Sequence, residues 1–154
     1  MSTTSERFSF PLTDSEEDKN YAASQLRHDA IQELSPLEFL SEDQREDITL
    51  AVGEAGTNAV KHALLKDNEE ECVTCEVVKA DDSFAVKITN PSDDLSTETP
   101  SLPESSEEEG RGRFVIDKIV QDLCQSGLEA QYSFCFEPQE NHSGRAIFSL
   151  SVRH

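Results

Sequence analysis

Apolar and polar positions follow two different periods along the chain, and the period separates predicted helices from predicted strands. Five alternating or β-branched segments predict strands, at residues 8–10, 72–78, 84–89, 130–137 and 144–152. Three segments with apolar residues on one helical side predict helices, at residues 15–34, 41–65 and about 110–123. The order is β-α-α-β-β-loop-α-β-β. Consecutive hairpins favour a mixed, mostly antiparallel sheet with helices on one face, an α/β fold of the α+β two-layer sandwich type.

The predicted ends of the first two helices rest on capping residues. Thr13 or Asp14 could cap the first helix, and Ser41 with Gln44 three residues later forms a capping-box pattern for the second. The apolar side of the first helix is predicted to comprise Tyr21, Leu26, Ala30, Ile31 and Leu34. The apolar stripe of the second, roughly 100° wide, comprises Ile48, Val52, Ala55, Ala59 and Ala63.

A polar column runs beside the apolar stripe of the second predicted helix. Glu54, Asn58 and His62 recur every four residues, so their side chains stack one turn apart on one face. Asn58 lies about 80° and Glu54 about 120° from the stripe's centre, whereas His62 lies nearer its apolar edge. A carboxylate, a carboxamide and an imidazole in one column suit a cleft better than a core. An ordinary polar helix flank is the simpler alternative.

The third predicted helix opens with Gly110, Arg111 and Gly112. It follows a proline-rich, acidic and nearly apolar-free stretch from Asn90 to Glu109, which predicts a mobile loop. Glycines at a helix start let backbone N–H groups approach an anion, and the helix dipole favours negative charge there. An amide oxygen can ligate Mg²⁺, and a carboxylate can accept a proton from a nucleophile. The glycine pair and the polar column together favour a phosphate site.

Composition limits the classes of partner. The 154 residues suffice for one domain, and a formal net charge of -19 disfavours direct binding to nucleic acid or to anionic membranes. A partner with a basic face fits better.

No run of about 18 apolar residues exists, and the first residues lack the features of a secretory signal, so a cytoplasmic protein is expected. The four cysteines are expected to be reduced, mostly buried thiols, although Cys72 and Cys75 have the spacing of half a zinc site or a redox pair.

Two segments resemble motifs of a known superfamily. Residues 54–62, Glu-Ala-Gly-Thr-Asn-Ala-Val-Lys-His, resemble the N-box of the GHKL ATPases and kinases. Residues 109–116, Glu-Gly-Arg-Gly-Arg-Phe-Val-Ile, resemble its second glycine box. With the segment order, the whole of residues 1–154 is most similar to the bacterial anti-sigma factor serine kinases of the RsbW type, as one histidine-kinase-like domain with an acidic lid at about 91–109.

The resemblance implies a Bergerat-type fold that binds ATP and Mg²⁺. It implies that Asn58 holds Mg²⁺, that Glu54 is the base toward a seryl hydroxyl, and that Gly110 and Gly112 cradle phosphates. His62 and Arg111 are further candidates for contact with the nucleotide. The implied activity is phosphorylation of an anti-anti-sigma protein of the STAS type, together with sequestration of a sigma factor, often as a homodimer.

One departure from the family pattern keeps an alternative open. Asn90, Pro91 and Ser92 stand where the family has Asp-x-Gly, whose Asp accepts from the adenine amino group. Asn90 can still accept through its oxygen but lacks the charge that strengthens such a bond. The alternative is therefore a binding module whose nucleotide site has degenerated, without kinase activity. A detached histidine-kinase ATPase domain is a weaker idea, because no helical hairpin carrying a phospho-accepting His is evident around His28.

Overall fold

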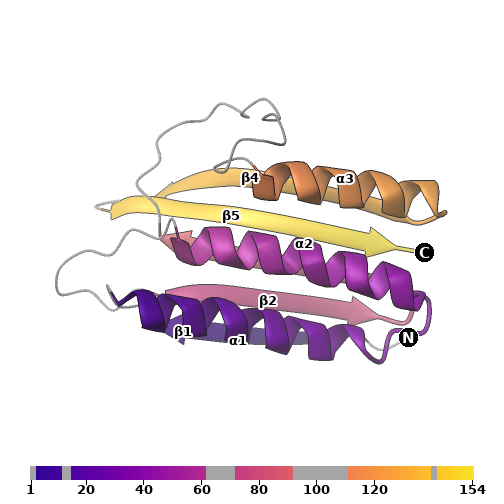
Figure 1. Ribbon diagram of the computed structural model, residues 1–154, viewed down its shortest axis with the longest axis horizontal. Helices are drawn as coiled ribbons and strands as arrows, with labels where there is room; N and C mark the ends of the chain where they lie inside the picture. The colour runs from indigo at the N-terminus through magenta and orange to yellow at the C-terminus, as the bar shows by residue number, and fades with distance from the viewer. Residues whose placement is uncertain (1–2, 12–14, 62–71, 92–110, 140–141) are drawn as a thin grey trace.

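Three helices cover one face of a five-stranded sheet in this computed structural model, which describes residues 3–11, 15–61, 72–91, 111–139 and 142–154 (Figure 1). The elements are β1 (Thr4–Pro11), α1 (Glu16–Leu34), α2 (Glu42–Lys61), β2 (Cys72–Ala80), β3 (Ser83–Pro91), α3 (Arg111–Gln125), β4 (Glu129–Gln139) and β5 (His142–Arg153). The strand order is β1-β2-β3-β5-β4, and all four pairings are antiparallel. The predicted two-layer sandwich and the predicted element order are confirmed.

The core lies between the sheet and the helical layer. Alternate residues of the central strands point to the helices, among them Val77 of β2, Phe84 of β3 and Leu150 of β5. Leu26 of α1 and Ile48 of α2 are buried against the same cluster, as is Ile116 of α3. Each helix therefore lies on the sheet through its own apolar stripe, and its polar sides face its neighbours or solvent.

The start of α1 and its apolar side differ from the prediction. Ser15 is the N-cap, and its hydroxyl accepts a hydrogen bond from the Asp18 amide at 3.4 Å. Thr13 and Asp14, the predicted caps, lie outside the described residues. Tyr21, predicted to face the core, is 70% exposed, whereas its neighbour Ala22 is buried. A one-residue step turns a helix by about 100°, which accounts for this exchange.

The start of α2 matches its predicted capping box. The Ser41 amide donates to Gln44 Oε1 at 2.8 Å, and the Gln44 amide donates to the Ser41 hydroxyl at 3.2 Å. Gln44 Nε2 also donates to the hydroxyl of Ser126, just beyond α3, at 2.9 Å. The Arg45 guanidinium donates to the Leu37 carbonyl at 2.5 Å. These bonds fix the first turn of α2 to the α1–α2 connection and to the end of α3.

The cysteines are free thiols, but they are not mostly buried as predicted. Cys75 is buried in the core, and burial together with nearby acidic groups raises its pKa to about 12. Cys72 is half-buried, and Cys124 and Cys135 are exposed. The prediction was wrong for the last two because their positions fall on the outer sides of α3 and β4.

No cluster of three metal-ligating side chains occurs within the described ranges. Of the described helices, none combines the length and apolarity that crossing a membrane requires.

Replacing Asp47 with Asn is expected to raise the melting temperature by about 2 °C at pH 7 and by nothing measurable at pH 3. Partial burial, then repulsion from Asp122 and Asp43, raises the pKa of the Asp47 carboxyl. The folded protein therefore binds this proton more tightly than the unfolded chain. The free energy of unfolding falls as pH rises from the pKa of the unfolded chain through the higher pKa of the folded protein. Thermal melts of Glu46→Gln, an exposed neighbour, serve as the control. An equal gain in melting temperature at both pH values would show that the raised pKa of Asp47 is not its cause.

Candidate functional site

Three chain segments that are distant in sequence meet at one end of the sandwich. The last turns of α2, the end of β3 and the first turn of α3 all lie at the same end of the molecule (Figure 1). α2 and α3 run antiparallel and contact each other, and α2 also contacts β3. Residues near the ends of these elements can therefore face a common ligand.

Gly112 brings the first turn of α3 directly against α2. It is buried, and a Cβ atom built on it would lie 2.8 Å from Asn58 Nδ2 and 3.3 Å from Glu54 Oε2. Real Cβ atoms essentially never approach another atom within 3.0 Å, so at this position glycine alone avoids displacing the Asn58 side chain. The structure thus brings together Glu54, Asn58 and Gly112, which the sequence identified in two separate motifs.

Helical geometry explains why Glu54 and Asn58 face α3. Both side chains are half-buried, on the flank of α2 next to its core stripe. The opposite flank of α2 packs on α1, where two more glycines permit close approach. A Cβ on Gly56 would lie 2.9 Å from Leu26 Cδ2, and one on Gly53 would lie 3.2 Å from Arg27 Cδ. The sequence prediction did not assign a role to these two glycines, although both lie within the motif-bearing segment.

Asn90 supplies a buried carboxamide at the end of β3. It is 6% exposed and is the buried polar residue of the described chain. It follows Phe84, Val86 and Ile88 on the core side of the strand, and its backbone pairs with Ala146 of β5. The Asn90 Nδ2 group donates to the Pro91 carbonyl at 3.0 Å. With one of its two N–H donors engaged there, the Asn90 side chain still has its oxygen as an acceptor for a further bond.

Not every predicted site residue lies in the described part of the chain. His62, Gly110 and the side chain of Arg111 lie outside the described residues, as does the predicted acidic lid from residue 92 onward. Arg113, a second cation at the start of α3, lies with its guanidinium carbon 4.3 Å from the centroid of the Phe134 ring on β4. A cation stacked in this way stabilises the packing of α3 on β4.

A second contact between α3 and β4 was also missed by sequence reasoning. The Tyr132 hydroxyl donates to Asp117 Oδ1 at 2.9 Å, and burial together with this bond raises the pKa of Tyr132 to about 12. Aromatic residues at alternate positions of β4 were the available signal, since they must face the helical layer. These contacts fix the rotation of α3 about its axis, and therefore the direction in which Gly112 faces.

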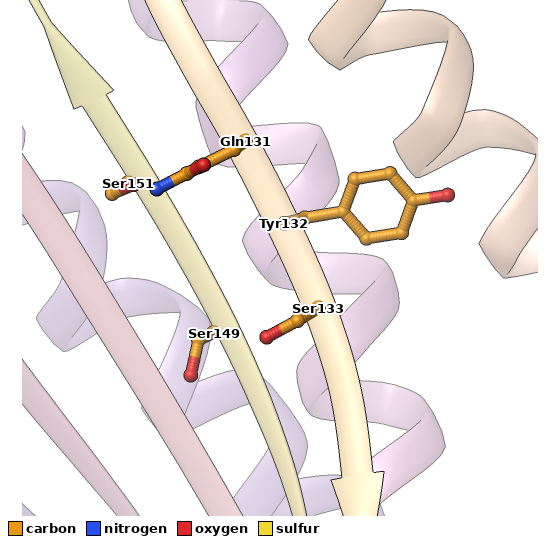
Figure 2. A pocket seen from close by; sticks show the side chains of 5 residues that line it. All are labelled: Gln131, Tyr132, Ser133, Ser149 and Ser151. Carbon is orange, nitrogen blue, oxygen red and sulfur yellow. The ribbon is translucent and has the colours of Figure 1, made fainter. Parts of the chain in front are cut away.

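A shallow hollow of about 240 Å³ lies elsewhere, on the sheet face that the helices leave open. Gln131, Ser133, Ser149 and Ser151 line it from β4 and β5, and Figure 2 shows the neighbouring Tyr132 ring pointing away from these side chains toward a helix. The hollow is therefore separated by the sheet from Glu54, Asn58 and Gly112, and it contributes nothing to their site.

Comparison with known proteins agrees with this geometry. Residues 16–131 match the family model of the histidine kinase-like ATPase domain, and this range contains all the candidate site residues. The chain belongs to the histidine kinase-like ATPase domain family. A comparison with curated proteins found no match. Membership implies binding of ATP, with which Mg²⁺ is typically associated.

Proposed function

We propose that this protein is an ATP- and Mg²⁺-dependent protein-serine kinase that phosphorylates an anti-anti-sigma factor and sequesters a sigma factor. The observation that carries the proposal is the contact of Gly112 with Glu54 and Asn58. It joins a proton acceptor and a metal-ligating amide to the start of a helix, and each of these groups has a use in phosphoryl transfer.

The residues present fit a nucleotide and a divalent cation. The first turn of α3 has backbone N–H groups without partners inside the helix, and glycine at position 112 keeps side-chain bulk away from them. Asn58 presents an amide group at this turn, and its oxygen is a suitable Mg²⁺ ligand. The Asn90 oxygen, oriented by the bond to Pro91, suits the amino group of adenine. Glu54 would repel a triphosphate that carried no metal, which favours a Mg²⁺-dependent site.

Each residue then has a defined task. ATP, when bound, supplies the γ-phosphoryl group, which is transferred to a seryl oxygen while ADP leaves. Glu54 accepts the proton of that seryl hydroxyl, so the oxygen becomes a better nucleophile as its bond to phosphorus forms. Asn58 would hold the cation, and the N–H groups of α3 would stabilise negative charge on the phosphates. Arg113 and Asp117 keep α3 in register on β4.

The composition supports a protein substrate with a basic face. The net charge is -19, and acidic residues are frequent on α2, which carries Glu54 and Asn58, and on α1, which packs on the opposite flank of α2. Such a surface attracts a cationic partner and accelerates its association. The sigma factor and the anti-anti-sigma factor are both proposed on this basis and on the resemblance of the two motifs.

The uncharged Asn90 favours a second candidate function. An Asn–adenine bond is weaker than one made by a carboxylate, so the chain could bind its partners without using ATP. In that case it acts as an anti-sigma or adaptor module with a degenerate nucleotide site. The two candidates predict the same protein partners and differ in the chemistry.

A transfer assay separates the two candidates. The full chain is incubated with γ-labelled ATP, Mg²⁺ and STAS-type proteins from the same genome, and phosphoserine is measured on each. The kinase predicts labelling of one such protein that depends on Mg²⁺. Tight binding of that protein without any labelling would instead assign the chain to the binding-module class.

Replacing Asn58 with Ala is expected to lower the affinity for Mg²⁺–ATP by about tenfold, because the cation loses an oxygen ligand. The affinity for ATP in excess EDTA is expected to change by less than about twofold. Thermal-shift titrations of both proteins, with and without Mg²⁺, measure this difference. Equal losses under the two conditions would show that Asn58 contributes to packing and not to cation binding.

A further inference from the structure

Two exposed apolar side chains lie beside the proposed site. Large apolar side chains are exposed at four described positions: Tyr21 (70%), Leu50 (50%), Val78 (40%) and Phe114 (37%). Leu50 is one helical turn before Glu54 on α2, and Phe114 is two residues after Gly112 on α3. Tyr21 and Val78 belong to α1 and β2 and have no such relation to Glu54 or Gly112.

Both side chains point out of the helical layer. On α2, Leu50 lies roughly 160° from the core residue Ile48, and on α3, Phe114 lies roughly 160° from the core residue Ile116, at 100° per residue. Gly112 faces Glu54 and Asn58, and the two helices run antiparallel. Leu50 and Phe114 therefore lie on the solvent side of adjacent helices.

The charge around Leu50 is negative. Glu42, Asp43 and Glu46 are exposed in the turns of α2 that precede it. Arg45 is turned toward the Leu37 carbonyl, and the exposed Lys118, one helical turn after Phe114 on α3, offsets only one of these three negative charges. Leu50 lies between this acidic surface and Glu54, so the surface is complementary to a segment that carries apolar and basic residues.

We propose that Leu50 and Phe114 form the docking surface for the acceptor segment of the protein substrate. This inference rests on the proposed function. The segment carries apolar residues that pack on Leu50 and Phe114, and Lys or Arg residues that face Glu42, Asp43 and Glu46. Packed in this way, it presents its seryl hydroxyl to Glu54.

Fluorescence anisotropy with labelled peptides tests the docking surface on the full chain. The parent peptide has a central serine flanked by leucines and lysines. In one altered peptide serines replace the leucines, and in the other glutamates replace the lysines. The parent is expected to bind at least about fivefold more tightly than either altered peptide. Equal affinities for the three peptides, or no binding of any, would overturn the proposal.

Protein variants then assign the preference to particular residues. Leu50→Ala and Phe114→Ala are each expected to weaken binding of the parent peptide by about fivefold and to leave the leucine-free peptide unaffected. Glu46→Lys is expected to remove the preference for lysine over glutamate. Tyr21→Ala and Val78→Ala remove the other two exposed apolar side chains and are expected to change binding by less than about twofold. Parent-peptide binding that is unchanged in Leu50→Ala and Phe114→Ala would overturn the proposal.

ATP titrations of the same variants separate this inference from the proposed function. Leu50→Ala and Phe114→Ala are expected to retain the wild-type ATP affinity. Selective peptide binding in a protein that binds no ATP would uphold the docking surface and reject the kinase. Sedimentation velocity identifies a competing occupant: if the wild type is a dimer and either variant is a monomer, the surface belongs to a second copy of the chain, and the proposal fails.

Discussion

Replacing Gly112 with Ala is expected to weaken ATP binding by about 30-fold while the domain remains folded. The new methyl group would lie 2.8 Å from Asn58 Nδ2 and 3.3 Å from Glu54 Oε2, so either α3 or both side chains must move. Overpacking of this kind typically costs about 1–3 kcal/mol. Alanine also favours a helix over glycine by about 1 kcal/mol, which offsets part of the strain in the unliganded fold. The strain is therefore expected to appear mainly as weaker ATP binding and less as lower stability of the unliganded fold.

Gly53→Ala is the matched control for this variant. A methyl group on Gly53 would meet Arg27 Cδ at 3.2 Å, and Arg27 is an exposed, long side chain that can move aside. ATP affinity is expected to stay within about twofold of the wild type. Thermal melts of both variants establish that they are folded, and fluorescent-nucleotide competition measures the affinity. Wild-type affinity in Gly112→Ala would remove the α3 turn from the nucleotide site.

Replacing Glu54 with Gln is expected to lower the rate of serine phosphorylation by about 10³-fold. Glutamine has nearly the same shape and can occupy the same place beside Gly112, but it cannot accept the seryl proton. ATP affinity is expected to be retained or slightly increased, because a negative charge is removed from the side of the triphosphate. Single-turnover transfer to the STAS-type acceptor and a separate ATP titration measure these two quantities independently.

Glu129→Gln, at an exposed position at the start of β4, is the control for the loss of one negative charge. Its transfer rate at saturating acceptor is expected to equal that of the wild type. An unchanged rate in Glu54→Gln would exclude Glu54 as the proton acceptor. A simultaneous loss of ATP binding in Glu54→Gln would instead indicate that this residue supports the shape of the site.

The sequence predicted the features of the fold that depend on local pattern. The capping box at Ser41 and Gln44, the core stripe of α2 and the position of Asn58 beside that stripe all follow from helical geometry within one segment. The contact between α2 and α3 could be predicted for a different reason. Each helix carries a motif of polar or glycine residues on one side, and the resemblance of the two motifs implied a shared ligand.

The features that the sequence did not predict depend on partners distant in the chain. Gly53 and Gly56 acquire a role only when α1 packs on them, and periodicity within α2 does not identify which helix lies there. The stacking of Arg113 on Phe134 likewise requires β4 to lie beneath α3. The burial of Ala22 in place of Tyr21 arises because alanines, which carry little hydrophobic signal, form much of the inner side of α1.

The central claim is that Glu54, Asn58 and Gly112 together form a binding site for Mg²⁺–ATP. Isothermal titration calorimetry of the full chain with ATP, in the presence and absence of Mg²⁺, tests it most directly. One saturable site with stronger binding in Mg²⁺ is the predicted result. No heat and no thermal shift at nucleotide concentrations up to about 1 mM would contradict the claim.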